Sequence, residues 1–193
     1  MSKKLEVGFN KKPIIITFVA IVLFVIATIT FICFPILSPN DAHSQYFCDR
    51  KIYSSKLDLN ISDMMKNSLY KIDGVFLSGS NDSITMSDTT EHEIASAKNS
   101  IISYGDETYC CEGDFSMFGN SYIIENSNGD KIAEIKVDVF GSKGLMSDDE
   151  GNVIARFDAS IARKDYIVSI YGSCGFDDEA VLMMFASYFN DIR

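Results

Sequence analysis

The chain has 193 residues, of which 47% are hydrophobic and 23% are charged, and its net charge is -10. This composition excludes a disordered chain and a collagen-like repeat. The acidity argues against nucleic acid as a partner of the chain as a whole. With no Trp and two His, His43 and His92, the sequence offers little for metal binding or proton transfer.

The first predicted element is a membrane helix. The run from Pro13 to Asn40 carries no charge, and about 20 apolar residues suffice to cross the hydrocarbon of a bilayer. A cleaved signal peptide is the alternative, but its apolar core is about 7–15 residues long and ends at a small-residue cleavage site. We therefore predict an uncleaved transmembrane helix over residues 13–37, preceded by a short tail, residues 1–12.

The charges beside this run predict its orientation. Its N-terminal flank contains one acid, Glu6, and the lysines Lys3, Lys4, Lys11 and Lys12. Because basic flanks stay in the cytoplasm, we expect the N-terminus inside the cell and everything after Asn40 outside it. The net +3 of the tail leaves -13 for the remainder, which anionic headgroups repel. The sequence thus predicts a single-pass protein of the cell membrane, held there by its helix alone.

A linker, residues 38–48, leads to a domain over residues 49–193 that contains a repeat. The segment 118–135 aligns without a gap with 140–157, 22 positions later. Each copy is typical of strand, Gly-containing turn and strand, and Asn128-Gly129 indicates a hairpin because both residues tolerate the positive φ of such turns. The second strand of the first copy predicts one face with Ala133, Ile135 and Val137 and the other with Ile132, Glu134 and Lys136.

A weaker third copy and several short strands extend this pattern. The third copy covers residues 83–98, and further strands are predicted at 101–104, 108–111 and 166–171, whereas 62–71 fits either a helix or a strand. Such a meandering antiparallel sheet is long enough to close on itself. All three copies contain an Ile-Ala pair: Ile94-Ala95, Ile132-Ala133 and Ile154-Ala155.

The chain ends in a predicted helix over Ala180–Phe189, which follows the acids Asp177, Asp178 and Glu179. Acids before good helix formers cap the helix and complement its dipole. The helix is apolar on every side, which indicates burial all round, and about ten residues are too few to span a bilayer. We therefore expect a mainly β, α+β fold in which an antiparallel barrel of hairpins encloses this helix.

Over roughly residues 50–193 the sequence resembles the tubby C-terminal-like superfamily, and most closely its LURP-one-related branch. The matching residues are the Gly turns at Asn128-Gly129-Asp130 and Glu150-Gly151-Asn152, each followed by Ile-Ala. The others are Glu112–Phe115 and the ending Asp178–Met183 with Asn190–Ile192. The resemblance implies a twelve-stranded antiparallel barrel around a hydrophobic C-terminal helix.

The resemblance also implies a non-enzymatic protein that binds phosphoinositides or, as in the scramblase branch, moves phospholipids. This sequence differs from the members of the superfamily in two features. The lipid binders of the superfamily use a basic pocket, whereas these hairpins are net acidic, and the scramblase-like members carry their membrane helix after the domain. No binding residue is therefore carried over to this chain.

The remaining motifs predict no catalytic, cofactor-binding or metal-binding residue. Asp148–Asn152 has the composition of a calcium loop without its spacing, so a solvated turn is the better interpretation, and His92 is expected on the surface. Four cysteines allow three disulfide pairings or none, and two sequons, at Asn60 and Asn81, leave glycosylation open. The fifth cysteine of the sequence, Cys33, lies within the predicted membrane helix, and the other four are Cys48, Cys110, Cys111 and Cys174.

Two functions remain. The first is a membrane-anchored, non-enzymatic binding or interaction module outside the cytoplasm, with an unidentified protein or lipid as its ligand and with no cofactor. The second is a lipid-handling protein, phospholipid-binding or scramblase-like, as the resemblance implies. A basic pocket between barrel and helix would favour the second function, and an exposed apolar rim would favour the first.

Overall fold

The computed structural model describes residues 21–22, 41–51, 57–75, 83–116, 119–138, 141–159, 165–172 and 175–191. The chain divides into two compact units, Met1–Leu37 and Ser38–Arg193. Of the predicted membrane helix, only Ile21 and Val22 are described, both helical, and the rest of residues 13–37 lies outside the described residues. Among the described residues, no helix combines the length and the apolar character that a membrane span requires.

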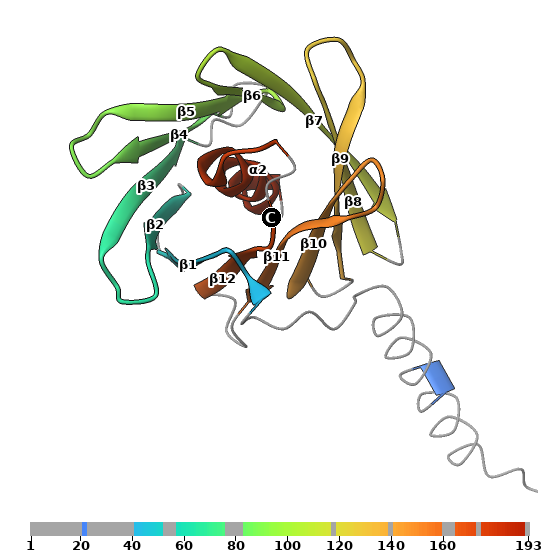
Figure 1. The fold of residues 1–193 in the computed structure, drawn as a ribbon, viewed down its shortest axis with the longest axis horizontal. Coiled ribbons are helices and arrows are strands. Elements are labelled where there is room, and N and C mark those ends of the chain that lie inside the picture. The colour runs from blue at the N-terminus through green and yellow to red at the C-terminus, as the bar shows by residue number, and fades with distance from the viewer. Residues whose placement is uncertain are drawn as a thin grey trace, which may run out of the picture. The chain divides into compact units, whose positions relative to one another are not determined.

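The second unit is a closed barrel of twelve antiparallel strands, which confirms the predicted fold. Consecutive strands pair, and β1 closes the barrel against β12, with Phe47 opposite Ile167. Figure 1 shows the strands arranged around α2. The strands are β1 Ser44–Arg50, β2 Asp58–Ser62, β3 Ser68–Val75, β4 Ser83–Asp88, β5 Glu93–Lys98, β6 Ile101–Tyr104, β7 Glu107–Ser116, β8 Gly119–Glu125, β9 Lys131–Val137, β10 Lys143–Asp148, β11 Val153–Ala159 and β12 Asp165–Ile170; the helix α2 is Asp178–Asp191.

Five of the connecting turns share one hydrogen-bond pattern. In each turn an Asp or Asn side chain accepts a hydrogen bond from the backbone N–H four residues later, at 2.6–3.0 Å. The residue three positions after this Asp or Asn has a positive φ, as in a three-residue hairpin loop with a G1 bulge. The Asp or Asn and the positive-φ residue are Asp63 and Lys66, Asp88 and Glu91, Asn126 and Gly129, Asp138 and Gly141, and Asp148 and Gly151.

This pattern holds in the predicted hairpin at Asn128-Gly129. The hairpin is present, but only Gly129 has a positive φ, and Asn128 is the ordinary residue before it. The residue that organises the turn is Asn126, whose Oδ1 accepts from the backbone N–H groups of Asn128 at 2.9 Å and Asp130 at 3.0 Å. The predicted hairpin is thus confirmed, with a three-residue loop and a side-chain acceptor.

The repeated Ile-Ala pair marks a β-bulge at the start of three strands. In three hairpins the pairing register shifts by one residue, between Met86 and Ser87 in β4 and at the matching places in β8 and β10. The Ile of the facing strand therefore has no residue paired with it across that hairpin. A bulge bends and twists the strand that carries it, which helps the sheet to curl. The Ala that follows points inward and is at most 2% exposed in each copy: Ala95, Ala133 and Ala155.

The helix α2 fills the barrel. Every side chain from Ala180 to Tyr188 is buried, so the predicted burial on all faces is confirmed. Phe157 of β11 meets Phe185 of the helix nearly edge-on, with ring centroids 5.3 Å apart. Gly144 in β10 is required here, because a Cβ at this position would lie 2.0 Å from Cε1 of Phe157.

The described cysteines, Cys48, Cys110 and Cys111, carry thiols and are not joined to one another. Cys48 and Cys111 are buried, and Cys110 is half-buried on the opposite side of the strand from its neighbour. Burial raises the pKa of the Cys48 thiol to about 12. Cys174 lies outside the described residues, as does the sequon at Asn81.

We predict that Leu182→Asn, Met184→Asn and Phe185→Asn each lower the free energy of unfolding by about 3–5 kcal/mol, since each buries an unpartnered amide and removes apolar packing. These three side chains point in different directions around the helix. Thermal and urea unfolding of the purified protein measures the effect, with the exposed Lys98→Asn as control. A near-neutral result for any of the three would contradict the enclosed helix.

Candidate functional site

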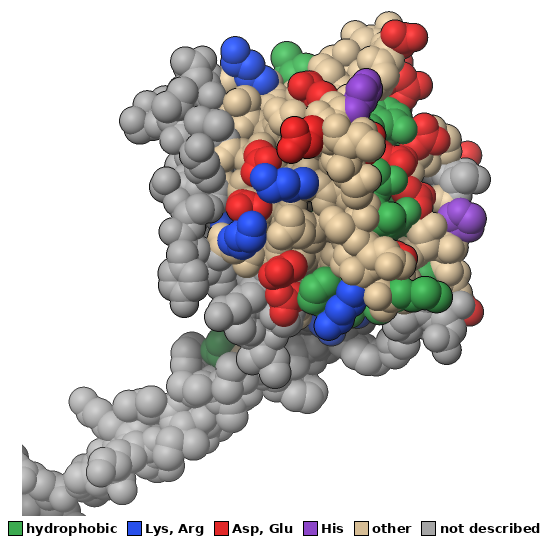
Figure 2. Space-filling model, turned by 90° about the vertical axis from the view of Figure 1, so that its left-hand side faces the viewer, with side chains coloured by type: hydrophobic (Ala, Val, Ile, Leu, Met, Phe, Trp, Pro, Cys, Tyr) green, Lys and Arg blue, Asp and Glu red, His purple; other side chains and the backbone are tan. Residues whose placement is uncertain are grey.

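One end of the barrel is rich in carboxylates, and we call it the acidic rim. It carries four of the five Asx turns, 63–67, 88–92, 126–130 and 148–152, together with the β6–β7 turn and the start of α2. The antiparallel order of the strands places these turns at the same end. Figure 2 shows several acidic side chains toward the right-hand edge of one face. His92 is exposed on this rim, as predicted.

A pocket of about 640 Å³ opens on the acidic rim. Its walls come from three neighbouring turns, β6–β7, β8–β9 and β10–β11, and from the segment that leads into α2. The described lining residues include no Lys, Arg or His. Five of them carry carboxylates, which are Asp106, Glu107, Asp148, Asp149 and Glu150.

The inner part of the pocket is apolar. Tyr109 is buried, and its ring lies 5.9 Å from the ring of Phe176, tilted by 56°. Ile132, the bulged residue of β9, completes this surface. The Tyr109 hydroxyl donates a hydrogen bond to a carboxylate oxygen of Glu107. The pocket therefore combines an aromatic interior with a mouth of negative charge.

Backbone hydrogen bonds hold the two walls that carry Asp148 and Asn126. The Asp148 carboxylate accepts from the backbone N–H of Asn152 at 2.7 Å and from its side-chain amide at 2.9 Å. The Asn126 side chain plays the same part in the β8–β9 turn. The interpretation of Asp148–Asn152 as a hairpin turn is thus confirmed, because these ligand-like oxygens are directed at their own backbone.

Three tyrosines from different strands fix the start of α2 beside the pocket. Each donates a hydrogen bond from its hydroxyl to an acid at the helix N-terminus. Burial, reinforced by the hydrogen bond to Asp177, raises the pKa of Tyr104 to about 12, and the other two pKa values also lie above the ordinary value of 10.0. All three hydroxyls therefore remain donors at neutral pH. The pairs are Tyr46 with Asp178 at 2.7 Å, Tyr70 with Glu179 at 2.6 Å and Tyr104 with Asp177 at 3.0 Å.

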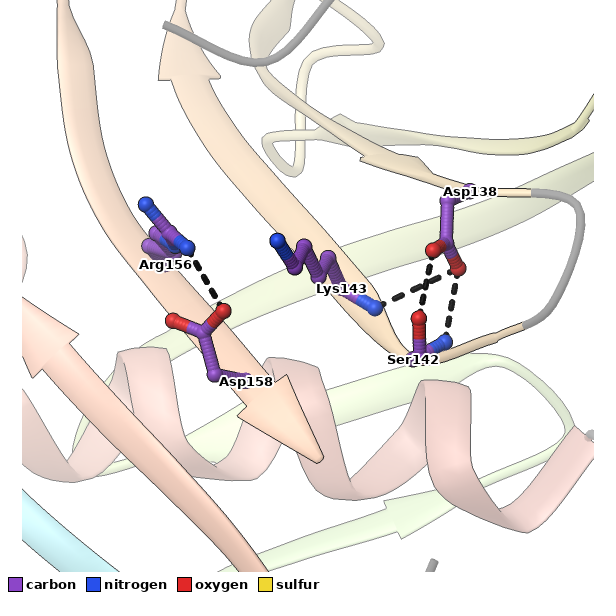
Figure 3. Close-up of polar contacts among 5 residues, drawn as sticks. All are labelled: Asp138, Ser142, Lys143, Arg156 and Asp158. Atoms are coloured by element: carbon purple, nitrogen blue, oxygen red, sulfur yellow. Dashed lines mark hydrogen bonds and ion pairs between the residues drawn. The ribbon is translucent and has the colours of Figure 1, made fainter. Parts of the chain in front are cut away.

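The described basic side chains do not gather into a pocket near these groups. Figure 3 shows Arg156 beside Asp158, with Nη2 and Oδ1 2.6 Å apart, and Asp138 accepting bonds from Ser142 and from the backbone N–H of Lys143. Other described lysines pair with nearby acids across the strand surface, at distances of 2.7–3.5 Å. The basic pocket of the superfamily's lipid binders has no counterpart among these residues.

The sequence did not predict this pocket, and it indicated Asp148–Asn152 only as a turn. Asp148–Asn152 was singled out by composition, but Asp106, Tyr109 and Phe176 carried no motif. They lie at the ends of elements far apart in sequence, and only closure of the barrel brings them together. The Asn60 sequon lies within β2, where Asn60 is half-buried and paired opposite Lys71.

Comparison with known proteins supports the fold alone. The structure is similar to an X-ray structure of a protein from Arabidopsis thaliana, with a TM-score of 0.50 and 10% sequence identity, over 81% of this chain and 98% of that one. No family model matches the chain, and a comparison with curated proteins finds no match. The second unit therefore has a tubby-like barrel fold.

We predict that Tyr46→Phe and Tyr70→Phe each lower the free energy of unfolding by about 1–2 kcal/mol. Each removes a hydrogen bond to a charged group in a half-buried place. Tyr104→Phe is expected to cost less, about 0.5 kcal/mol, because its bond to Asp177 is exposed. Urea unfolding checks this order. Equal, negligible effects at all three positions would show that the tyrosines do not hold the helix.

Proposed function

We propose that the protein is a membrane-anchored, non-enzymatic binding module whose barrel lies outside the cytoplasm and takes a cationic ligand into the pocket of the acidic rim. The observation that carries the proposal is the pocket itself, with five carboxylates, an aromatic interior and no basic residue among its described lining. Its volume of about 640 Å³ falls within the range of about 300–1,000 Å³ typical of ligand sites.

The chemistry of the lining favours an amine or guanidinium carried on an apolar stem. Carboxylates attract such a group over a distance and then accept its hydrogen bonds. The rings of Tyr109 and Phe176, which line the pocket, would pack against the stem, and aromatic rings also attract cations. A basic segment of another protein has this chemistry, and we take it as the partner.

The membrane anchor is supported by the sequence. The uncharged run from Pro13 to Asn40 is long enough to span a bilayer, and the four lysines before it favour a cytoplasmic N-terminus. The acidic rim is better suited to a soluble basic partner than to an anionic lipid, which its charge repels. Membership of the LURP-one-related branch is part of this proposal, since the fold and the short motifs point to it.

The lipid-handling alternative rests on the resemblance to the superfamily. It would require a site for phosphate-bearing headgroups, and the pocket repels such groups by its charge. The two functions differ in the sign of the charge on the preferred ligand. A single binding experiment therefore separates them.

We predict that protease added to intact cells digests the barrel unit and leaves the N-terminal tail protected. A tag at each end of the full chain, followed by immunoblotting before and after cell lysis, makes the measurement. Protection of the C-terminal tag until lysis would reverse the orientation and overturn the proposed location.

We also predict that full-length protein in detergent binds a fluorescent tetralysine peptide, and that Asp149→Lys with Glu150→Lys weakens binding at least about tenfold, or about 1.4 kcal/mol. The control, Glu91→Lys with Glu93→Lys, makes the same charge change on the rim outside the pocket and should have little effect. Fluorescence anisotropy at two salt concentrations measures both. Equal losses would indicate unspecific charge attraction, and preference for a phosphoinositide would favour the lipid-handling function.

A further inference from the structure

The most exposed apolar side chains of the barrel unit lie at one turn. Met65 is 85% exposed and Met64 is 52% exposed, more than any other large hydrophobic residue that the structure describes in this unit. Ile101 and Ile167, the next in order, lie singly on β6 and β12. Two adjacent methionines at the tip of a hairpin thus form the clearest apolar projection on the described surface.

The β2–β3 turn presents these methionines in a fixed conformation. The Asp63 carboxylate accepts hydrogen bonds from the backbone N–H of Met65 at 2.9 Å, from that of Asn67 at 2.8 Å and from the Asn67 side chain at 2.7 Å. Lys66 holds the positive φ of the turn and is exposed beside the pair. The hydrogen bonds therefore display two apolar side chains and one cation toward the surroundings.

The turn lies where the chain enters the barrel. β1 pairs with β2 so that Phe47 is opposite Ser62. β1 begins at Ser44, three residues before Phe47, and β2 ends at Ser62 and continues into the turn. Because the two strands are antiparallel, the start of β1 and the turn lie at the same end of the barrel. His43, just before β1, is also held at this end, because its N–H donates to the Ile170 carbonyl at 2.6 Å. The methionine tip is thus beside the entry of the chain.

The chain before this entry point is short. Six residues, 38–43, separate the predicted membrane helix from β1, and six extended residues reach at most about 20 Å. If the helix is in a bilayer, the start of β1 stays close to the lipid surface. A weak apolar contact then acts at a high effective concentration, although two methionines alone would not hold a free domain on a membrane.

The methionine tip and the acidic pocket occupy opposite sides of the rim. In the closed strand order, four strands lie between the β2–β3 hairpin and the β8–β9 hairpin on either side. Figure 1 shows these hairpins on opposite sides of α2. A contact between the tip and lipid would therefore tilt the barrel and turn the acidic pocket away from the headgroups, toward partners in solution.

We propose that Met64 and Met65 insert into the interface of the bilayer in which the chain is anchored, with Lys66 at headgroup level, and that this contact orients the acidic pocket away from the membrane. The occupant of this surface is the lipid, and the inference rests on the membrane anchor of the proposed function. Methionine and lysine suit this role because one is apolar and adaptable and the other keeps its charge in the polar layer.

The absence of Trp from the sequence provides a direct test with one introduced fluorophore. Full-length Ser68→Trp places the reporter next to the methionine tip, and Asn128→Trp places it on the exposed β8–β9 turn outside the pocket lining. Both proteins are reconstituted into phosphatidylcholine vesicles with or without brominated acyl chains. Vesicle flotation establishes anchoring, and the loss of Trp emission in brominated lipid reports contact with the hydrocarbon.

We expect Ser68→Trp to lose about half or more of its emission in brominated lipid and Asn128→Trp to lose little. Adding Met64→Asp and Met65→Asp should abolish the loss at position 68 without affecting flotation. Flotation without quenching at position 68, equal quenching at both positions, or quenching that survives the Asp substitutions would overturn the inference and leave the anchor intact. Failure of the chain to float would overturn the anchor, and the inference with it.

Discussion

The enclosure of α2 is the constraint on which the rest of the structure depends. A helix with buried side chains on all faces needs apolar partners in every direction, and a closed sheet supplies them. The fit is tight where the barrel wall has small residues, such as Ala133 and Gly144, and a Cβ at Gly144 would overlap Phe157. The repeated Ile-Ala pair serves this fit, since the bulge curls the sheet and the Ala leaves room inside.

The start of α2 is where enclosure and the candidate site meet. Acids at a helix N-terminus are favoured by the helix dipole, and here they also accept hydrogen bonds from Tyr46, Tyr70 and Tyr104 on three strands. Phe176, which packs in the pocket, precedes the first of these acids by one residue. The bonds that fix the depth and rotation of the helix therefore also fix one wall of the pocket.

Local patterns predicted most of the fold, and long-range pairs account for what they missed. The alternation in residues 131–137, the repeated hairpins and the apolar helix follow from neighbours in sequence, and the structure confirms them. The Tyr–acid pairs join residues 73 to 132 positions apart, and no spacing rule reveals them. The pocket escapes prediction for the same reason, and the role of Asn126 escapes it because Asn128-Gly129 is the stronger local turn signal.

The turns show which negative charges the fold itself requires. Asn126 accepts a hydrogen bond from the backbone N–H four residues later, as Asp148 does in the β10–β11 turn, so the turn needs the side-chain oxygen and not the charge. Asp149 and Asp106 are exposed and lie outside the acceptor position of any Asx turn. Folding alone therefore does not account for a concentration of carboxylates on three adjacent turns around an aromatic interior, whereas the proposed cationic ligand would. The same reasoning applies to the apolar turn across the rim, where Asp63 satisfies the backbone and the barrel gains nothing from methionine at positions 64 and 65.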